Sequence, residues 1–240
     1  MLNCDLNTGV CSTSSQIVQE NEGDKMDNNI VVRYIGDPMC SWCWGISNTI
    51  KEVSQFCQEN NLKFELYVGG LRAGGGDPWN KVFKNFLRTE WQHIAQVTGQ
   101  TFSSQLLELD YFDYDTEPAC RAIIVAKGLI RKNNLNIEDL LNFYTAVQYK
   151  FYVDGEDPKQ VEFYQSICNN LSLSFIDFTN LFQSEVAMQA VNKEFIQCRQ
   201  WGVNSFPTLL LEDHGKRTNL SIGYSKADSV LKKLQSYIVI

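Results

Sequence analysis

The stretch DPMCSWCWG, residues 37–45, directly follows the apolar run IVVRYI, residues 30–35. A short apolar run of this kind is typical of a buried strand, and the residues after it are predicted to turn into a helix. Cys40 and Cys43 are therefore predicted to lie at a strand-to-helix turn. Because a helix N-terminus presents unpaired N–H groups and a partial positive charge, it stabilises a thiolate. We expect Cys40 to be exposed, with a lowered pKa, and Cys43 to lie one helical turn further on.

Two cysteines that are separated by two residues can carry out thiol–disulfide exchange. A thiolate at Cys40 attacks a disulfide, and Cys43 is close enough to resolve the mixed disulfide that forms. A structural zinc site is the main alternative, but it needs four ligands, and the sequence holds a single CxxC. The two histidines, His93 and His214, lie far apart in the chain. Inert core cysteines are the remaining alternative, and we favour the redox pair, with no metal bound.

The length and composition of the chain limit the classes of function that this protein can have. The 240 residues suit one large domain or two small ones, and a bare thioredoxin-like unit needs only about a hundred residues, so a further segment is present. The net charge is −7 and there is no basic stretch, which disfavours nucleic-acid binding.

No apolar run approaches the ~20 residues that cross a membrane. Residues 1–29 lack the apolar segment of a secretory signal, so we expect a cytoplasmic protein with largely reduced cysteines.

The spacing of apolar residues outlines strands at both ends of the chain and helices between them. The predicted elements are strand 30–35, helix 41–60, strand 63–68, helices between 79 and 201 that include one over 158–170, strands 208–212 and 220–223, and a helix from Ser225. The first strand, helix and second strand form a parallel βαβ unit, and the two later strands form an antiparallel hairpin. Cys57, Cys168 and Cys198 fall on apolar helical stripes, so we expect them to be buried.

This order of elements predicts an α/β protein with a thioredoxin-like fold and an inserted all-helical domain. Residues 30–76 and 184–240 are predicted to form the thioredoxin-like domain, and residues 77–183 the insertion. Residues 1–29 are polar and are predicted to be a flexible N-terminal arm.

Three separated motifs resemble those of the DsbA-like thioredoxin-fold family, and within it the branch named predicted protein-disulfide isomerases. The motifs are DPMCSWCWG (residues 37–45), TEPACRA (residues 116–122) and GVNSFPTL (residues 202–209). The first motif is the most specific. Together the three motifs span nearly all of the chain beyond the arm.

The resemblance implies roles for residues of the third motif. Pro207 is expected to be cis and to face Cys40 and Cys43. The backbone of Phe206 is expected to pair with an extended peptide. The substrate-binding residues that the resemblance implies are Trp42, Ser205, Phe206 and Pro207. The sequence leaves open whether Trp42 faces a peptide or is covered by the helical domain.

The resemblance also implies a disulfide reductase or isomerase that acts on protein, peptide or small disulfide substrates with a thiol or other electron donor. The Ser41-Trp42 dipeptide replaces the CPHC or CPWC pattern of the best-known members, and without a histidine there we expect a milder oxidant. The same architecture occurs in glutathione-dependent isomerases and kappa-class glutathione transferases, which typically have Ser where Cys40 stands. Glutathione is therefore the alternative co-substrate, although the retention of Cys43 favours disulfide chemistry.

Cys4 and Cys11 flank a turn-like stretch in the arm. Their spacing is too long for a usual zinc knuckle. Two interpretations remain open. They are either incidental thiols of a disordered tail or an auxiliary redox pair that closes a small loop or relays electrons to Cys40.

Overall fold

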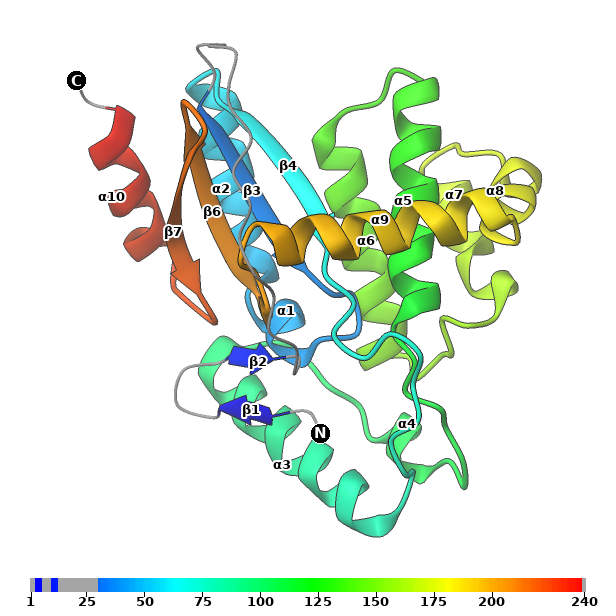
Figure 1. The fold of residues 1–240 in the computed structure, drawn as a ribbon. Helices are drawn as coiled ribbons and strands as arrows, with labels where there is room; N and C mark the ends of the chain where they lie inside the picture. Colours follow the sequence, from blue (N-terminus) through cyan, green and yellow to red (C-terminus); the bar gives the residue numbers. More distant parts are fainter. Residues whose placement is uncertain (1–2, 6–9, 13–29, 239–240) are drawn as a thin grey trace.

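A mixed four-stranded sheet lies at the centre of the fold, in a computed structural model that describes residues 3–5, 10–12 and 30–238. Its strand order is β4-β3-β6-β7 (Figure 1). The strands are β3 (Val31–Gly36), β4 (Lys63–Val68), β6 (Thr208–Asp213) and β7 (Lys216–Ile222). β3 pairs in parallel with β4 and antiparallel with β6, and β6 and β7 form an antiparallel hairpin. The predicted parallel unit and the predicted hairpin are therefore present.

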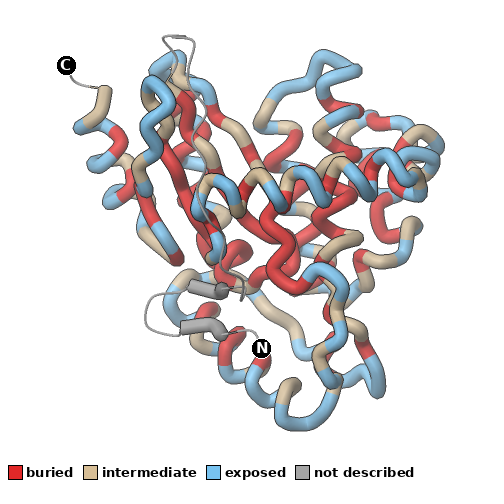
Figure 2. The backbone as a smooth tube through the Cα atoms, in the orientation of Figure 1, coloured by how far each residue is buried: buried red, intermediate tan, exposed pale blue. Residues whose placement is uncertain are grey.

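Two helices cover one face of this sheet: α2 (Ser47–Glu59) and α10 (Ala227–Ile238). Because side chains alternate along a strand, Val32 and Tyr34 of β3 share a face, and both belong to the main hydrophobic core. Buried residues concentrate in the strands and in the helices beside them (Figure 2).

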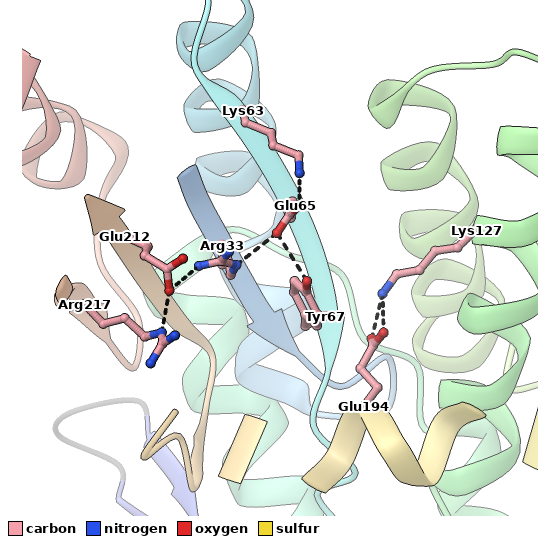
Figure 3. Close-up of polar contacts among 8 residues, drawn as sticks. All are labelled: Arg33, Lys63, Glu65, Tyr67, Lys127, Glu194, Glu212 and Arg217. Atoms are coloured by element: carbon pink, nitrogen blue, oxygen red, sulfur yellow. Dashed lines mark hydrogen bonds and ion pairs between the residues drawn. The ribbon is translucent and has the colours of Figure 1, made fainter. Parts of the chain in front are cut away.

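The opposite face of the sheet carries ion pairs that join neighbouring strands (Figure 3). The guanidinium of Arg33 on β3 lies 2.9 Å from the carboxylate of Glu65 on β4 and 2.9 Å from that of Glu212 on β6. Arg217 on β7 also contacts Glu212, at 2.5 Å. Arg33 stacks over the ring of Trp201 as well, 4.8 Å from its centre. Arg33 therefore links three strands on the face that α2 and α10 leave uncovered.

A block of helices lies between β4 and the last strands. Its members are α3 (Lys81–Thr98), α4 (Gln105–Glu108), α5 (Glu117–Lys132), α6 (Ile137–Tyr152), the 3-10 helix η1 (Val161–Tyr164), α7 (Gln165–Asn170) and α8 (Phe175–Phe182). The next helix, α9 (Glu185–Gln200), returns to the sheet and packs against α5 and β4. Glu194 of α9 accepts hydrogen bonds from Lys127 of α5 at 2.6 Å (Figure 3). It also accepts from the Val68 amide of β4 at 2.7 Å, which ties the block to the sheet. The predicted fold class is confirmed, and the boundaries 77–183 stay a prediction.

Two predicted helices differ from the structure. The helix over 41–60 is divided at Ile46 into α1 (Ser41–Gly45) and α2. Gly45 is a weak helix former, and a Cβ there would lie 3.0 Å from side chains of α3, so the break coincides with the close approach of α3. The helix over 158–170 starts later, as η1 followed by α7. The carbonyl of Pro158 accepts a hydrogen bond from the hydroxyl of Tyr164 instead of from a helical amide.

A short hairpin near the start of the chain was not predicted. β1 (Asn3–Asp5) pairs antiparallel with β2 (Val10–Ser12), and β2 pairs antiparallel with β5 (Ser205–Phe206). In Figure 1 the hairpin lies at the end of the sheet where α1 begins. The other residues of the arm over 1–29 lie outside the described residues, so the flexible arm stays a prediction.

Candidate active site

The two cysteines of the CxxC motif lie at the start of α1, as predicted. Cys40 is the N-cap residue with an extended backbone conformation, and Cys43 lies within the helix. The amide of Cys40 donates to the carbonyl oxygen of Asp37 at 3.0 Å, and the Asp37 amide donates to the sulfur of Cys43 at 3.5 Å. Both thiols are free, so the structure represents the dithiol form.

The environment of Cys40 corrects two expectations from the sequence. Cys40 and Cys43 are each 0% exposed, so the expectation that Cys40 is exposed is wrong. Burial raises the pKa of the Cys40 thiol well above its usual value, and the neighbouring Cys43 thiol adds to this. The expected lowering of the pKa is therefore also wrong. α1 has only five residues, and the partial charge at its N-terminus is outweighed by desolvation of the thiolate.

The loop that carries Pro207 packs against Cys40. The Phe206–Pro207 peptide bond is cis. The sulfur of Cys40 lies 3.9 Å from the carbonyl oxygen of Phe206, and Phe206 and Pro207 are both buried. Ser205 is half-buried, and its carbonyl accepts from the Thr208 hydroxyl at 2.8 Å. The structure thus brings the first cysteine of the motif to the backbone that precedes the proline.

Trp42 is covered, which resolves the alternative that the sequence left open. Its side chain is 2% exposed and lies 5.9 Å from the ring of His93 on α3 and 5.8 Å from the ring of Tyr224, measured between ring centres. Trp44 is also buried, and its indole N–H donates to the carbonyl of Thr101 at 3.0 Å. In this conformation both indoles pack within the protein, so a peptide would meet Trp42 only after α3 or Tyr224 had moved.

Asp37, the first residue of the motif that contains the two cysteines, is a buried carboxylate for which no role was predicted. Its Oδ1 accepts from the Met39 amide at 2.8 Å and its Oδ2 from the Leu71 amide at 2.7 Å. The thiol of Cys120 donates to Oδ2 at 3.4 Å. Burial raises the pKa of Asp37, although hydrogen bonds from Thr116 and from the two amides partly offset the rise.

The second sequence motif therefore serves the site. Thr116 and Cys120 stand four residues apart at the start of α5, which places them on one side of the helix, facing Asp37. The i, i+4 spacing of two small polar side chains was the available signal. Tyr114, just before this motif, donates to the carbonyl of Met39 at 2.9 Å and so holds the turn that carries Cys40.

The segment after β4 closes on the proline loop. A Cβ at Gly69 would lie 2.0 Å from the ring of Phe206, so only glycine fits there. Further along, the amides of Gly74 and Gly76 donate to Asp115 and Asp113, at 2.8 and 3.1 Å. The glycines thus serve a close backbone approach, and these amides are already paired with carboxylates.

The remaining predicted pair, Cys4 and Cys11, lies on the hairpin. Cys4 and Cys11 are directly opposite each other in the backbone register of β1 and β2. Cys11 is in turn opposite Phe206 in the register of β2 and β5. Backbone pairing therefore places both cysteines in line with the residue that contacts Cys40.

The described part of the chain shows neither a metal-binding cluster nor a membrane-spanning helix. No group of three or more His, Cys, Asp or Glu residues there is arranged to hold a metal ion. None of the helices formed by those residues is long and apolar enough to span a membrane.

Comparisons with known proteins place this site in a known architecture. No protein-family model and no curated protein sequence matches the chain. Among solved structures, a "putative protein disulfide isomerase" from Nitrosomonas europaea matches with a TM-score of 0.75 and 29% sequence identity, over 88% of this chain and 98% of that one. The cytosolic disulfide reductase DsbM from Pseudomonas aeruginosa matches with a TM-score of 0.70 and 21% identity, over 87% of this chain and 98% of that one.

Two further solved structures share the fold. DsbM has also been solved with GSH, and that structure covers 88% of this chain and 100% of its own, with a TM-score of 0.67 and 21% identity. A 2-hydroxychromene-2-carboxylate isomerase matches with a TM-score of 0.56 and 15% identity, over 87% of this chain and 94% of that one. At this low identity the match shows only that the two proteins share a fold. The chain resembles the DsbA-like thioredoxin-fold proteins, as the sequence indicated, and its neighbours support an enzyme of the thiol–disulfide oxidoreductase type.

Proposed function

We propose that this protein is a thiol–disulfide oxidoreductase of the reductase or isomerase type, working in the cytoplasm on protein or small disulfide substrates. One observation carries the proposal: the sulfur of Cys40, the first thiol of a free CxxC pair, lies 3.9 Å from the carbonyl oxygen of Phe206, next to the cis Pro207. A substrate strand that pairs with the backbone of Phe206 brings its own disulfide to Cys40.

The proposed reaction has two exchange steps. The Cys40 thiolate attacks one sulfur of the substrate disulfide, and the other substrate sulfur leaves as a thiolate that takes up a proton. Cys43 then loses its proton and attacks the sulfur of Cys40, which releases the second substrate thiol and leaves a Cys40–Cys43 disulfide. Two molecules of an external thiol such as glutathione then reduce the Cys40–Cys43 disulfide in two exchange steps and leave joined as their own disulfide. The GSH-bound structure of DsbM supports a low-molecular-weight thiol in that position.

Asp37 is the proposed acceptor of the proton from Cys43. Its carboxylate lies in the same buried turn, and the Asp37 amide contacts the Cys43 sulfur. Because burial raises the pKa of Asp37, the carboxylate is a stronger base than an exposed one. The raised pKa of Cys40 keeps most of that thiol protonated, so Cys40 gives up its proton before it attacks, and the leaving substrate thiolate takes up a proton in exchange.

Cysteine variants test the proposal directly. Cys43→Ser is expected to accumulate mixed disulfides between Cys40 and a peptide disulfide, because the resolving thiol is missing. Cys40→Ser is expected to accumulate none and to lose insulin reduction with glutathione. Cys57→Ala, which removes a buried thiol near the C-terminal end of α2, is the matched control and should retain turnover. Turnover by Cys40→Ser equal to that of the unmodified protein would refute the proposal.

A further inference from the structure

The hairpin of β1 and β2 lies on the strand edge that the proposed function assigns to substrates. β5 is a two-residue strand, and its partner in the described residues is β2. Extended peptides are commonly bound by adding a strand to such an edge through main-chain hydrogen bonds. β2 pairs with Ser205 and Phe206 in the antiparallel direction, so a segment of the chain itself takes up the geometry of a bound peptide.

The register of the hairpin aligns the backbone of its two cysteines with the residue that contacts Cys40. Cys4 is opposite Cys11, Cys11 is opposite Phe206, and the carbonyl of Phe206 contacts the sulfur of Cys40. Neighbouring strands are about 4.8 Å apart, so Cys11 lies one strand spacing from Phe206 and Cys4 two. Directly opposed residues of an antiparallel pair are close enough for a cross-strand disulfide.

We propose that Cys4 and Cys11 form a second redox pair, which the hairpin presents to Cys40 as an internal substrate. The proposal rests on the thiol–disulfide function argued above and adds a specific partner for the same site. It accounts for two observations together: a strand edge paired with a segment of the chain itself, and two cysteines in register with that edge.

The internal exchange needs no other reactant. The Cys40 thiolate attacks the Cys11 sulfur of a Cys4–Cys11 disulfide, the Cys11–Cys40 bond forms, and Cys4 leaves as a thiolate. Cys43 then attacks Cys40, the bond to Cys11 breaks, and the Cys40–Cys43 disulfide forms. Two electrons and two protons pass from the CxxC dithiol to the hairpin, and the reverse steps return them. Cys11 is the sulfur attacked because its strand is the one paired with β5.

Trapping the single-thiol intermediate tests the register. In the double variant Cys4→Ser/Cys43→Ser, Cys11 and Cys40 keep their thiols, and the other cysteine of each pair is removed. After mild oxidation with diamide in dilute solution, acid quenching and alkylation, peptide mass mapping should find a Cys11–Cys40 disulfide. The matched control adds Cys11→Ser and Ser12→Cys, which moves the thiol by one residue along β2. Because successive strand residues face opposite sides, the yield of a link to Cys40 should fall at least about tenfold.

The outcomes separate this proposal from the proposed function. Equal yields from the two variants would show a freely moving arm rather than a register-specific partner, and absence of the link in both would also overturn the internal pair. Insulin reduction by the full chain is measured in parallel. If the full chain reduces insulin while no link forms, the internal pair fails and the proposed function stands. A Cys11–Cys40 link in the double variant, together with a full chain that reduces no external disulfide, would support the pair and overturn the proposed function.

Discussion

The sulfur of Cys40 lies 3.9 Å from the carbonyl oxygen of Phe206, and both residues are buried. This contact joins the two halves of the site, which come from opposite ends of the chain. It also places the thiol in a position where water is excluded, and that exclusion raises its pKa. Cys40 is therefore kept mainly as a protonated thiol in this conformation, and it must lose that proton before it attacks a disulfide.

Replacing Asp37 tests its role as proton acceptor. Asp37→Asn is expected to slow resolution of a mixed disulfide at least about tenfold at neutral pH, since a positioned base typically contributes that much or more. Cys120→Ala is the companion variant, because it keeps the carboxylate but removes a donor that lowers the pKa of Asp37. It should shift the midpoint of the pH–rate profile upward. Single-turnover release of a peptide thiol across the pH range measures both, and an unchanged rate for Asp37→Asn would argue against proton transfer to this residue.

Gly69 offers a test of the contact between β4 and the proline loop. Gly69→Ala puts a Cβ where the Phe206 ring now lies, so the ring must move. Overpacking of this kind costs about 1–3 kcal/mol of unfolding free energy, and the displaced Phe206 should slow exchange at Cys40. Gly128→Ala is the matched control: this exposed glycine of α5 has nothing within 4 Å of the new Cβ. There the change should stabilise the helix by about 0.5–1 kcal/mol. Urea denaturation compares the two, and equal stability changes would contradict the structure.

The ion pairs on the sheet predict an unequal effect of two arginines. Arg33→Leu removes the shared partner of Glu65 and Glu212. Because loss of one member leaves a largely buried charge unpaired, the free energy of unfolding should fall by about 3 kcal/mol or more. Arg217→Leu removes a side chain that is 40% exposed, so the loss should stay within about 1 kcal/mol. Thermal and urea unfolding of the two variants at equal ionic strength check this. A larger loss from Arg217→Leu would show that the strands are not joined through Arg33.

Buried thiols predict that the protein loses stability in alkali. Burial raises the pKa of Cys57 to about 12 and that of Cys198 to about 12. A thiol whose folded-state pKa exceeds its unfolded value stabilises the folded state below the unfolded pKa, and this contribution is lost as pH rises toward the folded one. Between about pH 9 and 12 each such thiol should lower the free energy of unfolding by ~1.4 kcal/mol per pH unit. Cys57→Ala should reduce this slope in urea titrations under reducing conditions, and an unchanged slope would contradict the burial of that thiol.

Local patterns in the sequence predicted the parts of the site that depend on neighbouring residues. The apolar run over 30–35 and the following CxxC are adjacent in the chain, so the strand, the turn and the place of Cys40 followed from spacing alone. The core positions of Cys57 and Cys198 also followed from helical periodicity, and both are fully buried.

Long-range packing decided what the sequence could not show. Cys40 is covered by residues that lie far from it in the chain, such as Phe206. Its burial and its raised pKa therefore could not be predicted from the residues next to it in the sequence. β1 and β2 have three residues each; β1 pairs with β2, and β2 pairs in turn with β5, almost two hundred residues later in the chain. The role of Thr116 and Cys120 likewise depends on a carboxylate in another element.

The place of β1 also affects how this protein should be handled at the bench. An affinity tag fused ahead of Asn3 would continue from the strand beside β2 and so stand next to the thiols, where a polyhistidine segment can recruit metal and alter assays. α10 ends at Ile238, away from that hairpin (Figure 1). Purification tags, fluorophores and surface-immobilisation handles therefore belong at the carboxyl end, and kinetic values from amino-terminal fusions need comparison with the cleaved protein.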